Sequence, residues 1–348
     1  MQTAVDTMAT SQPPTSLLPS NEQGVNNWSV FMINNVIIAL TLLGNSTTLY
    51  LIARNKSLQS VTNKFVISLA CADLLMGCIY PLYNTLNYTT FYTDASELHV
   101  PCSISLYFIV VSAGVSNLSL LAVSIDRYIA VVHPFHYHMK VTERRANVTI
   151  VAIWVYIVIA SSSLFIVYGQ DTMTYYVAPC SMLNLIPEWY FFGIILPHML
   201  LPNICSKILY GRIVCVAQRL ESKTYGLNVE LRGQVHAKRE YRAAKVMALI
   251  MILFLLCWAP YIIFHVIIHV IGTESPDWLF VALELSKVLS VSSACINPII
   301  YTWKSEGFRR ALTSMCGCRS CHATDGQDKE LMRKRSLSVT SSVGIAPL

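Results

Sequence analysis

The sequence predicts an all-α membrane protein, a bundle of seven transmembrane helices followed by a short amphipathic helix. The chain has 348 residues, of which 54% are hydrophobic and only 13% are charged, whereas soluble domains carry about 25% charged residues. Seven stretches are also apolar over about 20 residues, the length of helix that crosses a bilayer. The composition therefore excludes a soluble enzyme, a disordered protein and a fibre, and indicates that lipid covers much of the chain.

The seven apolar stretches follow one another with polar connections between them. They cover residues 30–53, 65–87, 103–125, 148–168, 189–216, 246–270 and 279–302. The polar residues 1–29 lack the basic start and apolar core of a signal peptide, so they are interpreted as a retained extracellular tail. These boundaries predict four parts, namely the tail 1–29, a membrane domain 30–303, an amphipathic surface helix 304–316 and a disordered cytoplasmic tail 317–348.

The lysines and arginines predict how the spans are oriented. None of them lies in the connections or tails 1–29, 88–101, 169–188 and 271–278. All except Lys287, in the outer half of the seventh span, lie in the alternate connections, the inner ends of spans or the C-terminal tail. Because basic residues are enriched on the cytoplasmic side, we expect a multi-pass plasma-membrane protein with an extracellular N-terminus and a cytoplasmic C-terminus.

This orientation selects the candidate modification sites. Of the 11 cysteines, only Cys102 and Cys180 lie on the oxidising outer side, so we expect a disulfide between them. Such a disulfide would pin the second outer loop over the helices. The Asn-X-Ser/Thr sequences at Asn27 and Asn87 lie on the outer side or at its margin, and Asn27 is the better glycosylation candidate because Asn87 is close to the bilayer.

Asp73, in the middle of the second span, is the most unusual residue of the membrane region. A carboxylate at the bilayer centre costs about 2.5–3.5 kcal/mol on insertion scales, so it needs partners. Asn45, Ser116, Ser293 and Asn297 could supply hydrogen bonds from other spans. A sodium ion held by Asp73, Ser116, Ser293 and Asn297 could neutralise the charge. The alternative is a protonated aspartic acid that only packs and hydrogen-bonds.

Each of the seven spans carries a short motif at a defined depth. In order they are Gly44-Asn45, Leu69-Ala-Cys-Ala-Asp73, Asp126-Arg127-Tyr128, Trp154, Pro202 with Tyr210, Cys257-Trp258-Ala259-Pro260 and Asn297-Pro298-Ile299-Ile300-Tyr301. Each motif alone is weak, but the ordered set resembles the rhodopsin-like, or class A, G-protein-coupled receptors. The resemblance implies a seven-helix bundle that couples an extracellular small-molecule ligand to activation of a heterotrimeric G protein.

The resemblance also implies an activation switch. Asp126 and Arg127 lie at the inner end of the third span, and Glu240 of the sixth span could pair with Arg127 until an inner cavity opens. Without switching, the same residues would form an ordinary interfacial salt bridge. The remaining switch residues are Trp258 beside the expected hinge at Pro260, Asn297 and Pro298 at a second hinge, and the tyrosines Tyr210 and Tyr301.

The segment after the seventh span predicts contacts with lipid and with regulators. Between Lys304 and Met315 the apolar residues share one face and the arginines the other, as in an amphipathic helix on the inner leaflet. The helix is followed by three candidates for palmitoylation, Cys316, Cys318 and Cys321. Further along are two candidates for phosphorylation, Ser336 and Ser338. An arrestin-like regulator could read the added charge, and the alternative is a tail that is only disordered and solvated.

Markers of the receptor subfamilies restrict the ligand. Ile109 stands where amine receptors carry an aspartate, and Val291 stands where opsins carry the retinal lysine, with Lys287 one turn further out. The stretches 240–245 and 256–260 resemble adenosine receptors most, but His265 replaces the asparagine that holds the purine there. The alternatives left open are an adenosine- or amine-like receptor with altered ligand contacts and an opsin-like photoreceptor with a displaced lysine.

An outer cavity is the predicted ligand site. Its expected lining is Tyr83, Asn84, Ile109, Ala113, His198, Tyr261, His265 and Lys287, a largely apolar set, as is usual for small-ligand sites. Lys287 could bind a carboxylate or phosphate, or it could pair with Glu284 three residues earlier on the same helix. His198 and His265 could sense protons or metal, although two histidines on different helices are more often ordinary polar residues.

The competing class of protein is a transporter or channel. Transporters tend to have repeated halves with broken helices, and no such symmetry is visible in this sequence. The motifs HExxH, nucleophile elbow and phosphate-binding glycine loop are also missing from it, which argues against an enzyme. We expect no cofactor beyond the sodium ion and no nucleic-acid partner.

Overall fold

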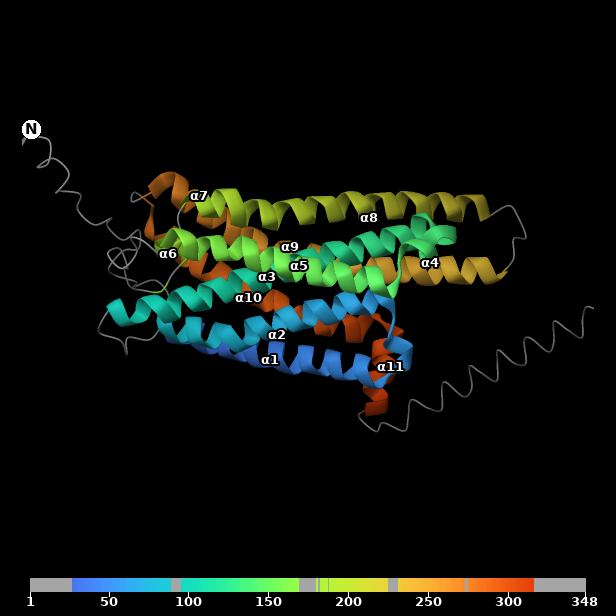
Figure 1. Cartoon of the computed structure of the whole chain (residues 1–348), viewed down its shortest axis with the longest axis horizontal. Coiled ribbons are helices and arrows are strands. Elements are labelled where there is room, and N and C mark those ends of the chain that lie inside the picture. Colours follow the sequence, from blue (N-terminus) through green and yellow to red (C-terminus); the bar gives the residue numbers. More distant parts are fainter. Residues whose placement is uncertain are drawn as a thin grey trace, which may run out of the picture.

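The computed structural model describes residues 27–88, 95–168, 180, 182–186, 188–224, 231–272 and 275–315. Seven candidate membrane spans run side by side in one bundle (Figure 1). Their main helices are α1 (Asn27–Arg54), α2 (Val61–Tyr88), α3 (Ala95–Val132), α5 (Glu143–Tyr168), α8 (Leu196–Thr224), α9 (Leu231–Ile271) and α10 (Asp277–Lys304). The described part of the chain contains no strand. The predicted all-α bundle of seven spans is confirmed.

Short elements lie in the connections and after the last span. They are the 3-10 helices η1 (Lys56–Leu58) and η2 (Pro134–His136) and the helices α4 (Tyr137–Lys140), α6 (Met182–Leu185) and α11 (Glu306–Met315). Helix α11 turns away from the bundle axis just after α10 (Figure 1). It buries Phe308 and Ala311 and exposes Arg309 and Arg310, so the predicted amphipathic helix is confirmed.

The two ends of the bundle differ in what they carry. At one end the predicted disulfide links Cys102 of α3 to Cys180 just before α6, with a Cα–Cα distance of 5.8 Å. At the other end Arg54 finishes α1, and α11 lies beside it (Figure 1). We call them the disulfide end and the α11 end.

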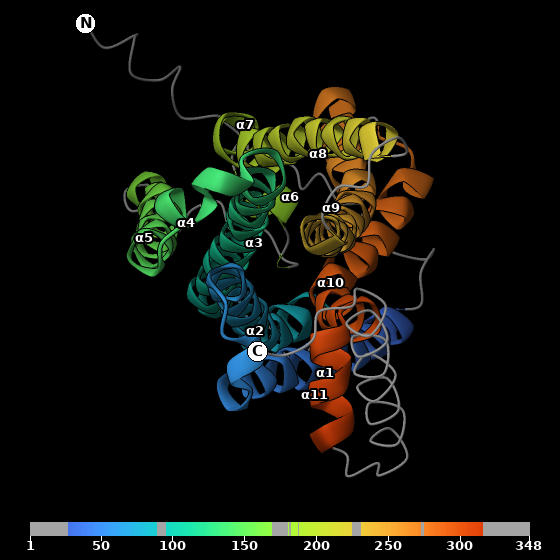
Figure 2. The ribbon, with the colours of Figure 1, turned by 90° about the vertical axis from the view of Figure 1, so that its right-hand side faces the viewer.

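Helix α3 is the centre of the bundle. It packs against α2, α5, α8 and α9, and in the view along the bundle these helices surround it (Figure 2). Polar side chains join the helices where they touch. The Ser68 and Ser119 hydroxyls are 3.1 Å apart, and the Trp154 indole N–H donates to Ser68 over 3.1 Å. Such bonds help helices to associate where lipid removes the hydrophobic driving force.

Helices α1 and α10 approach closely because one position is glycine. A Cβ atom built at Gly44 would lie 3.0 Å from the Cβ of Pro298, which is tighter than ordinary van der Waals contact. A larger side chain at this position would push α1 away from the proline of α10.

Pro202 removes one backbone hydrogen bond of α8, and a side chain of α3 replaces it. Proline has no N–H to donate to the carbonyl four residues earlier, which is that of His198. The side-chain amide of Asn117 donates to this carbonyl over 2.7 Å and to that of Met199 over 3.3 Å. The Asn203 amide in turn donates to the Asn117 side-chain oxygen over 3.0 Å. A polar residue of α3 thus satisfies the carbonyl that Pro202 leaves free.

The fifth span, predicted over 189–216, consists of several helical segments. It begins with α7 (Glu188–Tyr190) and passes through the π-helical segment η4 (Phe191–Ile195) before α8. A π-turn joins residue i to residue i+5 and accommodates one extra residue. Phe191 and Ile195 point into the core, so the segment is part of the packed bundle.

Several predicted residues lie outside the described part of the molecule. These are the candidates Cys316, Cys318, Cys321, Ser336 and Ser338, and the side chains of Asn27 and Glu240. The predicted pairing of Glu240 with Arg127 therefore stays a prediction.

Candidate functional site

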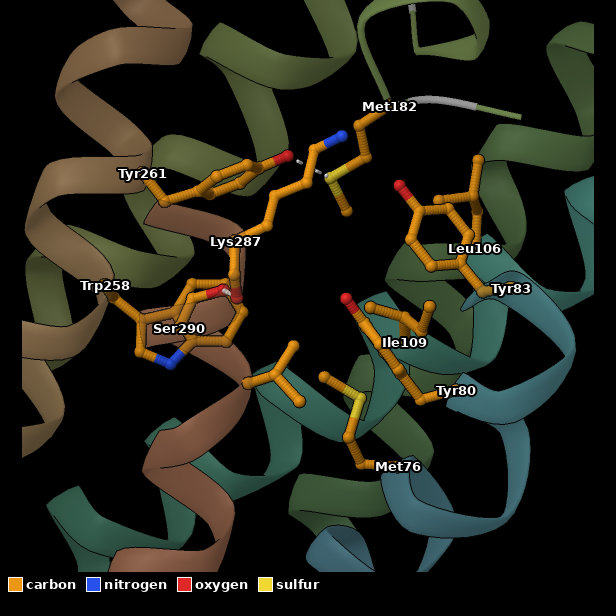
Figure 3. A pocket seen from close by; sticks show the side chains of 11 residues that line it. Met76, Tyr80, Tyr83, Leu106, Ile109, Met182, Trp258, Tyr261, Lys287 and Ser290 are labelled. Atoms are coloured by element: carbon orange, nitrogen blue, oxygen red, sulfur yellow. Dashed lines mark hydrogen bonds between the residues drawn. The ribbon is translucent and has the colours of Figure 1, made fainter. Parts of the chain in front are cut away.

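A cavity near the disulfide end lies between α2, α3, α9 and α10, with α6 beside it (Figure 3). The lining residues are Met76, Tyr80, Tyr83, Leu106, Ile109, Met182, Trp258, Tyr261, Lys287, Ser290 and Val291. The hydroxyls of Tyr80 and Tyr83 point into the cavity from α2, and Lys287 extends from α10 on the opposite side (Figure 3). The wall is apolar and aromatic with few polar groups, as in most sites for small ligands.

The cavity is small. Its volume of about 30 Å³ has room for about two water molecules, at roughly 10–15 Å³ each. Pockets that enclose drug-sized ligands are about tenfold larger. A ligand of that size therefore has to move the flexible side chains of the lining, among which Met76, Met182 and Lys287 have the most rotatable bonds.

The structure brings together half of the predicted lining. Tyr83, Ile109, Tyr261 and Lys287 line the cavity, whereas Asn84, Ala113, His198 and His265 do not.

Asn84 and Ala113 are not among the residues that line this cavity. The Asn84 side chain faces α1, where it accepts a hydrogen bond from the Asn34 amide over 3.0 Å and donates to the Phe31 carbonyl over 3.2 Å. Ala113 is buried in the packed helix core.

The two predicted histidines are also turned away from the cavity. His198 faces α5, because its Nδ1 donates to the Ile194 carbonyl and its Nε2 accepts from the Tyr156 hydroxyl, each over 2.6 Å. His265 is fully buried against the ring of Phe191, with 4.1 Å between the ring centroids. The suggested pair of His198 and His265 is therefore not formed.

Met182 is a lining residue that the sequence analysis missed. It follows Cys180 in the connection between spans four and five, and the disulfide carries it over the cavity. The Tyr261 hydroxyl donates to its sulfur over 3.0 Å (Figure 3). A methionine in a connection gives no signal in the sequence, although the predicted disulfide indicated which loop would cover the site.

Lys287 forms an ion pair with Glu284, one turn away on α10. This is the second of the two alternatives that the sequence left open for it. The Tyr88 hydroxyl donates to the other carboxylate oxygen of Glu284. Lys287 is only 5% exposed, and a buried ammonium is stable when a carboxylate and further hydrogen bonds compensate its charge.

Asp73 lies deeper in the bundle and is buried. Its two carboxylate oxygens accept from the Ser116 hydroxyl over 3.0 Å and from the Asn297 amide over 2.9 Å. Ser293 does not contact it directly, because its hydroxyl donates to the Ser290 carbonyl and accepts from the indole N–H of Trp258. Of the four predicted sodium ligands, three are therefore joined by hydrogen bonds, and Ser293 connects to the cavity wall instead.

A second polar cluster lies at the α11 end of α3. The Asp126 carboxylate accepts from the Arg127 guanidinium over 2.7 Å, from the Thr62 hydroxyl over 2.6 Å and from the Tyr137 hydroxyl over 2.9 Å. Arg127 also donates to Thr62. The sequence analysis missed Thr62 and Tyr137, which lie on α2 and α4 and carry no motif. Partial burial, followed by the nearby Asp126 charge, raises the pKa of Tyr137 to about 12, so the phenol remains a donor at neutral pH.

The two predicted switch tyrosines are buried between this cluster and Asp73. Tyr301 is 2% exposed, and its hydroxyl has no hydrogen-bond partner among the described residues. Its ring stacks on Phe308 of α11 at 5.7 Å. Tyr210 is 8% exposed on α8. A buried hydroxyl without a partner costs free energy in this state, so a rearrangement that gives it one is favoured by that amount.

Comparison with known proteins agrees with this architecture. Residues 44–301 match the family described as "7 transmembrane receptor (rhodopsin family)". The adenosine receptor A2b of Bos taurus is 29% identical over 299 residues, which cover 78% of this chain and 85% of that protein. The histamine H2 receptor of Canis lupus familiaris is 28% identical over 303 residues, covering 84% of this chain and 80% of that protein.

The fold also agrees with a solved structure. Squid rhodopsin superposes with a TM-score of 0.66 at 22% identity, covering 83% of this chain and 84% of that one. The family match extends from Gly44 of α1 to Tyr301 of α10 and so includes the last part of the first span and nearly all of the other six. The chain belongs to the rhodopsin family of seven-transmembrane receptors.

Proposed function

We propose that this G-protein-coupled receptor detects a small extracellular ligand that carries a carboxylate or phosphate group, and that Lys287 binds this group. The observation that carries the proposal is that Lys287 is the one charged side chain among the described residues that line the cavity. The hydroxyls of Tyr80 and Tyr83 face the same space (Figure 3). An anion placed there would meet an ammonium and two O–H donors in a site of low dielectric constant, where such bonds are strong.

Glu284 competes with the ligand for Lys287 in this proposal. Without ligand, its carboxylate compensates the ammonium of Lys287. A ligand anion therefore has to displace Glu284 from Lys287, or bind Lys287 together with it. The Tyr88 hydroxyl donates to the other carboxylate oxygen of Glu284, so Glu284 keeps a hydrogen-bond partner when a ligand shares Lys287.

The disulfide end is extracellular in this proposal, and the α11 end binds the G protein. The support is the charge distribution, because Lys287 is the exception among lysines and arginines that otherwise gather toward the α11 end. Asn27 would then carry glycan, the cysteines after Met315 would carry palmitate, and phosphorylated serines of the tail would recruit an arrestin-like regulator.

Asp73 is the candidate sodium site. Both of its hydrogen-bond partners are neutral, and a carboxylate that is 3% exposed needs a proton or a cation to compensate its charge. Asp73, Ser116, Ser293 and Asn297 supply only oxygen ligands, which suit a hard cation. A sodium ion bound by both Asp73 and Ser293 would act on Trp258 through the Ser293 hydroxyl.

Ligand binding would change the equilibrium of the switch through these contacts. The cluster of Asp126, Arg127, Thr62 and Tyr137 holds α3 to α2 and α4 at the α11 end. A G protein needs this end to open, which requires some of these bonds to break. A ligand can shift such a two-state equilibrium only by its difference in affinity for the two states.

The test is G-protein dissociation in cells across the main Gα classes, with a panel of amine, purine, anionic and peptide ligands. The wild type is compared with Lys287→Met, and Lys64→Met is the control because Lys64 also pairs with a glutamate, 3.1 Å away, but lies at the α11 end. We expect an anionic agonist whose potency falls about 10-fold or more in Lys287→Met, as for loss of a charged hydrogen bond of about 1.5–3 kcal/mol. Equal potency in the wild type and Lys287→Met would refute the anchor.

Glu284→Gln separates ligand binding from a purely structural role of the ion pair. If Lys287 binds the ligand, removal of the competing carboxylate raises agonist potency. If the pair only stabilises α10, Glu284→Gln and Lys287→Met lower surface expression alike and shift potency by the same small amount. Surface expression is measured for every variant so that folding and binding defects are distinguished.

An opsin-like photoreceptor is the second candidate, because Glu284 is placed where it could serve as the counter-ion of a protonated Schiff base on Lys287. Purified receptor incubated with retinal would then gain a visible absorbance band. The band would be lost in Lys287→Met. Reconstitution that leaves the visible spectrum flat excludes this candidate.

A further inference from the structure

Two histidines in the last turns of α9 form a cluster that the ligand cavity does not use. His265 and His269 are one turn apart on the helix, and their Nε2 atoms face each other at 3.1 Å. The carboxylate of Glu188, at the start of the fifth span, lies 3.7 Å from Nδ1 of His269. His265 is fully buried, and the side chain of His269 is 2% exposed. We propose that His265 and His269 bind a zinc ion at the disulfide end.

The distance between the two Nε2 atoms is that of neighbouring zinc ligands. At Zn–N distances of about 2.0–2.1 Å, two nitrogens of a tetrahedral site are about 3.3 Å apart. The observed 3.1 Å therefore needs to widen by only a few tenths of an ångström. The spacing i, i+4 on one helix is also the spacing by which paired histidines hold zinc in metal-dependent enzymes.

The other ring nitrogen of His269 fits the same assignment. When Nε2 binds a metal, Nδ1 carries the proton, and a metal-binding histidine almost always donates it to a carboxylate, a carbonyl or water. Glu188 provides the carboxylate for His269. In this structure the Nδ1 atoms of both histidines are buried without a hydrogen-bond partner, which is a rare and costly state. Zinc would fix the tautomer of both rings and draw Glu188 toward His269.

The remaining ligands of the zinc ion are water. No group of three His, Cys, Asp or Glu side chains surrounds a single point in the part of the chain that the structure describes. The site has two protein nitrogens and is therefore weaker than a closed structural zinc site with four protein ligands. The Glu188 side chain is 71% exposed, so solvent reaches the edge of the cluster.

Zinc bound here would act on the ligand cavity. The ring of His265 packs on that of Tyr261, with 5.5 Å between the centroids, and Tyr261 lines the cavity and donates to Met182. His265 also packs on Phe191 of η4, so the site lies where the fifth and sixth spans meet. Zinc is then a second ligand, whose effect on agonist affinity is reciprocal by linkage.

The test uses purified full-length receptor and Zn²⁺, with Mg²⁺ as the control cation. Zn²⁺ should raise the midpoint of thermal unfolding of the wild type, and Mg²⁺ should not. The shift should be absent in His269→Ala and retained in His198→Ala. His198 is a suitable control because its Nε2 pairs with the Tyr156 hydroxyl instead. Glu188→Gln should weaken the apparent zinc affinity about 10- to 100-fold, as for other outer-shell partners.

Two further measurements keep the result clear if His269→Ala folds poorly. His269→Cys retains a zinc ligand and should retain the zinc-dependent shift. Co²⁺ in place of Zn²⁺ should give a visible absorption band in the wild type that His269→Ala lacks. A wild type that does not respond to Zn²⁺, or a shift of equal size in His269→Ala, would leave only a hydrogen bond between the two rings and overturn the proposal.

Discussion

Replacement of Asn117 by leucine tests how α3 compensates for the proline of α8. The substitution keeps the approximate volume of the side chain but removes the donor to the His198 carbonyl and the acceptor of Asn203. Hydrogen bonds between membrane helices are worth about 0.6 kcal/mol on average and up to about 1.7 kcal/mol. Loss of two of them should therefore lower the free energy of unfolding by about 1–3 kcal/mol.

The assay is equilibrium unfolding of the purified receptor in mixed micelles. The control is Asn35→Leu, because among the described residues the amide of Asn35 donates to the Phe31 carbonyl of its own helix and to no other helix. This variant should cost less than Asn117→Leu.

The background Pro202→Ala supplies the decisive comparison. Alanine restores the N–H that reaches the His198 carbonyl, so Asn117 is no longer needed for that bond. The cost of Asn117→Leu should fall by about 0.6–1.7 kcal/mol in this background. An identical cost in both backgrounds would refute the idea that Asn117 serves the carbonyl left free by Pro202.

Three further substitutions test other parts of the molecule. In the wild type, replacing choline chloride with sodium chloride should raise the stability by about 1.4 kcal/mol at a sodium concentration ten times the Kd. Asp73→Asn should abolish this rise, and a sodium effect that persists would exclude this aspartate as the ligand. Gly44→Ala should cost about 1–3 kcal/mol in the free energy of unfolding because its Cβ would be 3.0 Å from the facing proline, whereas Gly211→Ala, with nothing within 4 Å, should be neutral or stabilising. Tyr137→Phe removes the hydrogen bond to Asp126, worth about 1 kcal/mol, and should raise basal nucleotide exchange about fivefold. In the wild type the contribution of this bond is fully present below about pH 10. It is lost as the pH rises toward the folded pKa of Tyr137, about 12. Unchanged basal exchange in the phenylalanine variant would show that this bond does not restrain the switch.

The spans were predictable from the sequence because lipid imposes a simple rule on composition. A helix that crosses a bilayer has to be apolar over about 20 residues, and each predicted stretch falls inside an observed helix or, for the fifth span, a run of helical segments. The disulfide followed from the same reasoning, because orientation left only Cys102 and Cys180 on the oxidising side. These are features that each residue carries alone or with its near neighbours in sequence.

The cavity lining was only half predictable because it depends on how each helix is rotated. His198 was expected in the cavity, but the hydroxyl of Tyr156 on α5 binds its ring on the other side. Thr62 and Tyr137 joined the cluster at Asp126 without any motif, since a hydroxyl becomes a partner only when packing brings it within reach. These contacts depend on how two helices are rotated against each other, and the residue pattern of one helix does not predict that rotation.

The π-helical segment η4 also sets the register for any comparison with related receptors. Its extra residue rotates everything before it by about 100° relative to a continuous α-helix. Positions counted back from Pro202 are therefore aligned as far as Ile195 but are out of phase by one residue at Phe191 and Glu188. An alignment to a relative without this turn needs a one-residue gap within η4, and deletion of Gly193 would swing Phe191 off the ring of His265.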